Sequence, residues 1–129
     1  MKQREIKFRA WDGVNNVMKE WEYIAIQFDI TDLFGNERFT PMQFTGLTDK
    51  NGVEIYEGDI VTADLKQPRL MNWPCKGFIQ FLNGEFVINT GKQLLDDDND
   101  YYAHFWAHDN IEVIGNIYEH PELLTIKNS

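Results

Sequence analysis

Three acidic residues near the middle of the chain are the first candidates for acid–base chemistry. Glu54, Glu57 and Asp59 lie within six positions of one another, and paired carboxylates are groups that general acid–base catalysis uses. The sequence Glu57-Gly58-Asp59 is also typical of a tight turn, because glycine and aspartate both suit turn geometry. We favour the turn, since the β-branched run 60–62 follows it directly.

His104 and His108 are the candidate metal ligands, with Asp109 beside them. On a helix, residues four positions apart share one face, which is how two histidines bind zinc in a zinc-binding helix. On a strand the two residues also share a face, but about 13 Å separates them. No glutamate of an HExxH pattern lies between them, so we favour rings at the edge of an aromatic core.

The run Asp96-Asp97-Asp98-Asn99-Asp100 is the densest cluster of charge in the chain. A calcium loop of the EF-hand type needs glycine at its sixth position and glutamate at its twelfth. Tyr101 and Ala107 occupy those positions. The EF-hand interpretation therefore fails, and we expect a solvated loop between strands.

Cys75 is the single cysteine, and Lys76 beside it could lower the pKa of its thiol. A thiol nucleophile also needs a histidine base, and we favour a structural thiol. One cysteine excludes a disulfide within the chain. The sequence contains no Gly-x-Ser-x-Gly elbow, P-loop or dinucleotide fingerprint. We therefore predict that the protein is not an enzyme, with no catalytic, cofactor-binding or metal-binding residues and no cofactor.

Lys7 and Arg9 share one face of an alternating segment, 6–11, which is typical of a strand with one buried side. The two cations could contact a phosphate or form the solvent face of the strand. They could also pair with acidic residues of the rest of the chain or of a second subunit, which is the alternative we favour.

The charge balance limits the classes of partner. The chain has 12 basic and 21 acidic residues, a net charge of −9, and residues 46–129 carry six basic and 14 acidic residues, a net −8. Nucleic-acid binding depends on Lys and Arg that neutralise phosphates, so we expect no direct nucleic-acid contact. No apolar run near the start is typical of a signal peptide or a membrane span. We expect a cytoplasmic protein that contacts no membrane.

The elements that would position these residues are mostly strands. The 129 residues include 14% aromatics, enough apolar area for a real core. Asn83-Gly84 between two apolar runs is typical of a type I′ hairpin. We predict a mainly β fold: a β-rich N-terminal region (1–41), then a small antiparallel, SH3-like β-barrel (42–129) ending in a short helical tail. The expected strands are 6–11, 17–21, 23–30, 60–62, 77–81, 85–88, 101–106 and 111–117, with 33–40 expected as a loop.

Segments 6–12, 44–61 and 113–119 together resemble the YopX family of phage and prophage proteins. They contain Ile-Lys-Phe-Arg-Ala-Trp-Asp, then Phe-Thr-Gly-Leu-Thr-Asp-Lys-Asn-Gly with Ile-Tyr-Glu-Gly-Asp-Ile-Val, and finally Val-Ile-Gly-Asn-Ile-Tyr-Glu. The resemblance implies the two-part β architecture, a cytoplasmic protein of a phage or prophage, and a tendency to form homo-oligomers. It implies no established activity. Its glycines are expected to serve backbone geometry (Gly46, Gly52, Gly58, Gly115) and its apolar residues packing (Phe44, Tyr56, Ile60, Ile117).

Three functional hypotheses follow. The first is a noncatalytic interaction module that assembles with itself and with a phage or host protein. The second is an acidic regulator that presents carboxylates to the basic groove of a nucleic-acid-binding protein. The third is a metal-dependent enzyme, for which Glu57, Asp59, His104 and His108 are the only residues worth mutating.

Overall fold

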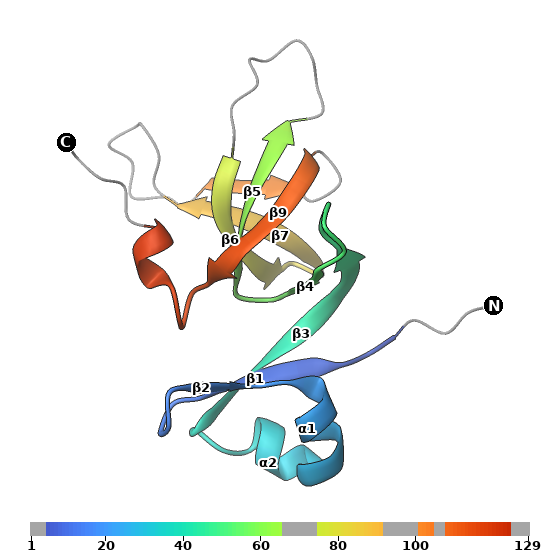
Figure 1. Cartoon of the computed structure of the whole chain (residues 1–129), viewed down its shortest axis with the longest axis vertical. Helices are drawn as coiled ribbons and strands as arrows, with labels where there is room; N and C mark the ends of the chain where they lie inside the picture. The colour runs from blue at the N-terminus through green and yellow to red at the C-terminus, as the bar shows by residue number, and fades with distance from the viewer. Residues whose placement is uncertain (1–4, 66–74, 92–100, 105–107, 125–129) are drawn as a thin grey trace.

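Two antiparallel sheets make up the computed structural model, which describes residues 5–65, 75–91, 101–104 and 108–124 (Figure 1). The first sheet has the strand order β2-β1-β3-β4, and the second has the order β8-β7-β6-β5-β9. The mainly β prediction is therefore confirmed. The strands are β1 (Phe8–Asp12), β2 (Val17–Lys19), β3 (Phe39–Thr48), β4 (Glu54–Tyr56), β5 (Asp59–Leu65), β6 (Cys75–Leu82), β7 (Glu85–Gly91), β8 (Tyr101–His104) and β9 (His108–Asn116).

The first two strands, within the expected strands 6–11 and 17–21 apart from Asp12, form an antiparallel hairpin. Ala10 pairs with Lys19 and Asp12 pairs with Val17, so the strand expected over 17–21 is present from Val17 to Lys19. The turn places Asn16 at φ 54°, a conformation that asparagine tolerates better than most residues. Trp21, expected to continue the second strand, instead begins a helix.

The strand expected over 23–30 is wrong, because this region is helical. Helix α1 covers Trp21–Gln27 and helix α2 covers Ile30–Phe34. The loop expected over 33–40 is therefore also wrong in its first two residues, and in its last two, which begin β3. A strand would have placed Ile24, Ile26, Phe28 and Ile30 on one buried face. Only Ile24 of these is fully buried, with Leu33 of α2, against Ala10 of β1.

Strand β3 connects the two halves of the molecule (Figure 1). Its first residues, from Phe39 to Gln43, pair with β1, and its later residues pair with β4 across an irregularity between Phe44 and Thr48. Gly46, at φ 88°, lies in this irregular stretch. One strand of the first sheet thus starts at the end of the molecule that carries α1 and α2, which we call the helix-bearing end, and extends toward the second sheet (Figure 1). The boundary expected between residues 41 and 42 falls inside it.

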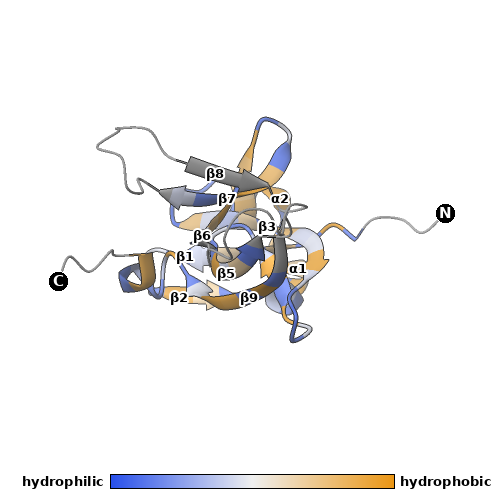
Figure 2. Cartoon of the chain, turned by 90° about the horizontal axis from the view of Figure 1, so that it is seen from above, coloured by the Kyte–Doolittle hydropathy of each residue, from blue (hydrophilic) through white to orange (hydrophobic). Residues whose placement is uncertain are grey.

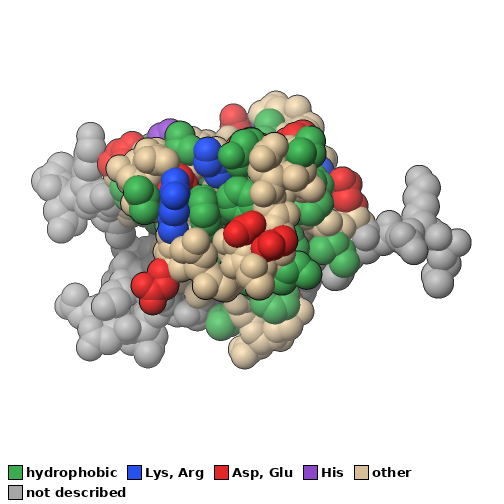
Figure 3. Space-filling view, turned by 90° about the horizontal axis from the view of Figure 1, so that it is seen from below, with side chains coloured by type: hydrophobic (Ala, Val, Ile, Leu, Met, Phe, Trp, Pro, Cys, Tyr) green, Lys and Arg blue, Asp and Glu red, His purple; other side chains and the backbone are tan. Residues whose placement is uncertain are grey.

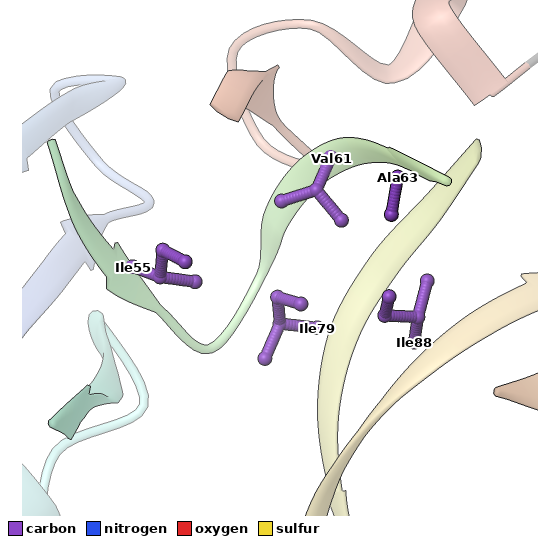
Figure 4. Packing of buried hydrophobic residues seen from close by; sticks show 5 residues of the cluster. All are labelled: Ile55, Val61, Ala63, Ile79 and Ile88. Atoms are coloured by element: carbon purple, nitrogen blue, oxygen red, sulfur yellow. The ribbon is translucent and has the colours of Figure 1, made fainter. Parts of the chain in front are cut away.

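The second sheet curls around its own apolar core. Ile55 of β4, Val61 and Ala63 of β5, Ile79 of β6 and Ile88 of β7 point toward one another there (Figure 4). Seen from above, the strands of this sheet carry both hydrophobic and hydrophilic residues (Figure 2). Buried and partly exposed residues alternate from Gly77 to Gln80 of β6, as expected for a strand with one buried face.

The type I′ turn expected at Asn83-Gly84 is also confirmed. The β6–β7 hairpin has Asn83 at φ 52° and Gly84 at φ 83°, both positive as a type I′ turn requires. Near the C-terminus, Pro121–Leu124 form a 3-10 helix, at the position of the expected helical tail. Leu123 and Leu124 are half-buried there, and Leu123 packs close to Gly115 of β9.

Candidate functional site

The cations of β1 pair with carboxylates from the second half of the chain. Nη2 of Arg9 donates to Oδ1 of Asp59 at 2.5 Å and to the backbone carbonyl of Glu57 at 3.4 Å. The guanidinium also lies over the ring of Tyr56, 4.9 Å from its centroid. Both members of the ion pair are buried. Pairing with acidic residues of the same chain, the favoured alternative for Lys7 and Arg9, is confirmed.

Lys7 makes the same kind of contact two residues earlier on the strand. Its ammonium pairs with Glu54 of β4 and, at 3.1 Å, with Glu5. It also lies 4.8 Å from the ring centroid of Phe44. The carboxylate of Glu54 raises the pKa of Lys7 above its ordinary value, and burial opposes this increase only in part. Lys7 is therefore a buried cation that is already neutralised.

The Glu57-Gly58-Asp59 sequence forms a tight turn. Gly58 has φ 82°, and its N–H donates to the carbonyl of Ile79 at 2.8 Å. The carboxylate of half-buried Glu57 accepts the N–H of Gln43 at 2.9 Å. The carboxylate of Asp59 accepts the N–H of Tyr56 at 2.8 Å. Both carboxylates thus hold backbone groups in place.

Burial governs the protonation of the groups around this turn. It raises the pKa of Asp59, and the charge of Arg9 and the Tyr56 N–H offset part of that increase. Burial also raises the pKa of Tyr56 to about 12, helped by the negative charge of Glu54. The carboxylates of Asp59 and Glu57 are both held in ion-pair or hydrogen-bond contacts with neighbouring residues.

The three segments that carry the family resemblance meet at the Glu57-Gly58-Asp59 turn. We call this turn and the residues it contacts the junction. Trp11 of β1 stacks on Tyr118, with ring centroids 5.5 Å apart and an angle of 18° between the planes. The N–H of Ile117 donates to the carbonyl of Gly58 at 2.9 Å. Arg9 in the first segment, Gly58 in the second and Ile117 in the third are therefore in one connected structure. Their arrangement joins the helix-bearing end to the curled sheet.

Two buried aspartates were missed by the sequence analysis. Asp49 accepts the N–H groups of Asn51 at 2.8 Å, Val53 at 2.9 Å and Val113 at 2.9 Å. Burial alone would raise the pKa of Asp49, but these three donors outweigh it and lower the pKa. The Asp-Lys-Asn-Gly sequence indicated the turn, while the contact with Val113 depends on the tertiary fold.

The second missed aspartate is Asp12, whose carboxylate accepts from Nε and Nη2 of Arg38 at 3.0 and 2.9 Å. It also accepts from the N–H groups of Val14 and Asn15. The Arg38 guanidinium holds the pKa of Asp12 below its ordinary value despite burial. Asp12 followed by glycine signalled a turn, but nothing in the sequence signalled the pairing with Arg38, 26 residues away.

The Asp96–Asp100 run lies outside the described part of the chain. His104 ends β8, His108 begins β9 and Cys75 begins β6, but their side chains are not described. Within the described residues, no group of three or more His, Cys, Asp or Glu side chains is placed to hold a metal ion.

The helices α1 and α2 border an apolar hollow of about 360 Å³. Its lining is mainly apolar: Phe8, Trp21, Ile24, Ala25, Phe28, Asp29, Ile30, Leu33 and Phe34. Ile30 is 77% exposed and Phe34 54%, and Ile26 and Tyr23 on α1 are exposed as well. We call the hollow together with these four exposed side chains the α1–α2 surface. The sequence analysis missed it because the strand interpretation buried Ile26 and Ile30.

The α1–α2 surface includes charged groups of both signs. Asp29 is in the lining of the hollow, and the ammonium of Lys19 lies over the ring of Tyr23, 4.7 Å from its centroid. Residues 20–37 contain five acidic residues and no basic residue. Seen from below, this end of the molecule shows apolar side chains with both acidic and basic ones among them (Figure 3). Exposed apolar groups of this kind, bordered by polar residues, are typical of protein interaction sites.

The comparisons with known proteins agree with the architecture. The model of the YopX family, described as YopX protein, matches residues 7–125, and the chain belongs to this family. A crystal structure of protein EF1440 from Enterococcus faecalis is similar, with 29% sequence identity and a TM-score of 0.59. The match covers 95% of this chain and all of that one. The comparison with curated proteins finds no match.

The described residues include no helix that is long and apolar enough to cross a membrane.

Proposed function

We propose that the protein is a noncatalytic interaction module that assembles with copies of itself through the α1–α2 surface. The observation that carries the proposal is the exposure of Ile26, Ile30 and Phe34 around an apolar hollow. Burying one exposed isoleucine side chain contributes roughly 1.5–3 kcal/mol. Two or three such side chains at the centre of an interface would supply much of the free energy of a micromolar complex.

The engagement of the candidate catalytic groups supports a noncatalytic role. Asp59 is paired with Arg9, Glu57 holds the backbone of Gln43, and Glu54 is paired with Lys7. Each carboxylate that the sequence offered for acid–base chemistry therefore has a structural partner. A general base needs a carboxylate that can reach a substrate proton.

Light scattering over a micromolar concentration series tests the proposal. We expect a molar mass above the 15.2 kDa of one chain that rises with concentration. Ile30→Lys should weaken association about tenfold or more, because it places a charge where an apolar contact forms. Leu47→Lys is the matched control, since Leu47 is also exposed, at 52%, but lies near the end of β3. A wild-type protein that stays at the mass of one chain would overturn self-assembly.

A second candidate function is favoured by the charge of residues 20–37. Five carboxylates without a basic residue would suit a regulator that binds a basic, apolar segment of a nucleic-acid-binding protein. Such a complex should dissociate as added salt screens its charges. Affinity purification at low and moderate salt, with wild type and Glu22→Gln in parallel, tests this function. Retention that depends on neither salt nor Glu22 would exclude it.

The finer features of the family resemblance belong to the same proposal. We propose an SH3-like barrel for the curled sheet, a phage or prophage origin, and a cytoplasmic location in the bacterial host. A phage or host protein as an additional partner is compatible with an exposed α1–α2 surface, because assembly need not occupy every copy.

A further inference from the structure

The hollow beside α1 and α2 has the size and lining of a site for a small molecule. Its volume of about 360 Å³ lies within the range of roughly 300–1,000 Å³ that is typical of ligand pockets. The floor is fixed, because Ile24 and Leu33 are buried and pack with Ala10 of β1. The space equals that of about twelve water molecules, which suits one ring with a short chain.

Aromatic side chains make up much of the lining. Four of the nine lining residues are aromatic: Phe8, Trp21, Phe28 and Phe34. Phe8 and Phe34 meet edge to face, with their ring centroids 5.3 Å apart. Aromatic side chains bind the apolar part of a ligand, and the face of such a ring also attracts a cation. The lining therefore favours a ligand that contains a ring and tolerates a positive charge.

Asp29 is the charged residue in the lining, among the residues that the structure describes. Its Oδ1 accepts the N–H of Asp32 at 3.0 Å and the hydroxyl of Thr31 at 2.6 Å. The Thr31 hydroxyl and the Asp32 N–H lower the pKa of Asp29, so the carboxylate is charged at neutral pH. A carboxylate has about four acceptor positions. Asp29 can therefore cap α2 and accept a further donor.

The basic side chains nearby are engaged outside the hollow. The ammonium of Lys19 lies over the ring of Tyr23, and the guanidinium of Arg38 pairs with Asp12 at 2.9 Å. Neither cation is part of the lining. The lining therefore presents one negative charge beside an aromatic, apolar space.

We propose that the hollow binds a small organic cation, a molecule with one aromatic ring on a short chain that ends in an ammonium group. The ring lies among the aromatic side chains, and the ammonium pairs with Asp29. This site goes beyond the proposed self-assembly and does not depend on it, because each copy contains the complete hollow.

Phenethylamine is the probe that tests the site, and phenethyl alcohol is its neutral control, with a hydroxyl in place of the ammonium. Backbone amide NMR on the full chain should show saturable shifts that concentrate on lining residues such as Ala25 and Leu33. Phenethylamine should bind several-fold, up to about fivefold, more tightly than phenethyl alcohol, as expected for an exposed ion pair. Equal dissociation constants would overturn the choice of a cation.

Two charge-removing variants test the contact with Asp29. Asp29→Asn removes the charge and keeps a good helix cap. Asp32→Asn removes a charge from the same end of α2, but Asp32 does not line the hollow. The preference for phenethylamine should disappear in Asp29→Asn and persist in Asp32→Asn. An equal loss in both variants would assign the preference to the general field of the protein and contradict the contact.

Ile26→Gln separates this site from self-assembly. Ile26 is 80% exposed and does not line the hollow, so this variant should weaken association and keep the site. If Ile26→Gln and wild type both lack saturable shifts with phenethylamine, the site is overturned whatever the mass of wild type. Shifts in Ile26→Gln alone, with an assembled wild type, would support both proposals, because a second copy then covers the hollow. Shifts in wild type that has the mass of one chain at every concentration would support the site and overturn self-assembly.

Discussion

Gly58 is the residue whose replacement best tests the tight turn. It has φ 82°, and a Cβ there would lie 3.1 Å from Sδ of Met42 and 3.7 Å from Cγ1 of Ile117. Gly58→Val should lower the free energy of unfolding by about 1–3 kcal/mol from backbone strain, with a further loss from crowding. Thermal melts measure the change.

Gly52→Val provides the matched control for Gly58→Val. Gly52 has φ 81°, but a Cβ there would meet nothing within 4 Å. Both variants suffer the backbone strain, and only Gly58→Val displaces Met42. We expect Gly58→Val to melt at the lower temperature of the two. Equal melting temperatures would mean that the packing of the turn against Met42 contributes nothing.

The lowered pKa of Asp49 predicts how the stability of the protein depends on pH. Its pKa is lowered in the folded protein, so its stabilising contribution is complete above its unfolded pKa of about 3.9 and is lost as the pH falls through its folded pKa. Asp49→Asn should be destabilising at pH 7, because an amide cannot replace all three accepted hydrogen bonds. The difference in melting temperature between wild type and Asp49→Asn should shrink below about pH 4. A difference that is constant from pH 7 to pH 3 would contradict this role.

At the scale of elements, α1 and α2 show why a period-two pattern is not sufficient evidence for a strand. Ile24, Ile26 and Ile30 alternate with less apolar residues, yet only Ile24 is buried. The helix signal lies at Asp29, whose carboxylate accepts the N–H of Asp32 while the Asp32 carboxylate accepts the N–H of Asp29. This capping box marks a helix start. It uses aspartate at its fourth position instead of the usual glutamate or glutamine.

The capping box gives a prediction at this scale. Asp29→Ala removes the side-chain acceptor and should destabilise α2, while Asp29→Asn should retain most of the effect, because asparagine is also a good N-cap. Because α2 carries Ile30 and Phe34, Asp29→Ala should also weaken self-association. Circular dichroism and light scattering on the two variants test this. Equal helix content in both would show that the cap does not hold α2.

Elements with strong local signals could be predicted from the sequence, and those determined by distant contacts could not. Asn83-Gly84 and Gly58 require positive φ, so their turns follow from residue type alone. The pairing of Arg9 with Asp59 joins residues 50 positions apart. Local patterns indicated that Lys7 and Arg9 need acidic partners but could not name those partners. The α1–α2 surface was missed because it depends on the helices.

At the scale of the whole molecule, the Arg9–Asp59 pair holds the helix-bearing end against the curled sheet. Nε of Arg9 has no hydrogen-bond partner in the described part of the chain, so the guanidinium depends on Asp59 for its neutralisation. Asp59→Asn should destabilise the protein by roughly 3–5 kcal/mol, because it leaves a buried charge unpaired. Arg9→Met should also be destabilising. In urea unfolding, the double variant should lose less than the sum of the two, and strict additivity would contradict the pairing.

The Glu57-Gly58-Asp59 turn holds the two sheets together, whereas we propose that the α1–α2 surface binds the partner. The most direct test is the molar mass of Glu57→Gln and Ile30→Lys by light scattering at one concentration where wild type assembles. Glu57→Gln should assemble like wild type, because its amide oxygen can still accept the Gln43 N–H. Ile30→Lys should have the mass of one chain while melting near the wild-type temperature. The opposite result, with Glu57→Gln failing to assemble and Ile30→Lys assembling normally, would place the binding site at the junction and contradict the claim.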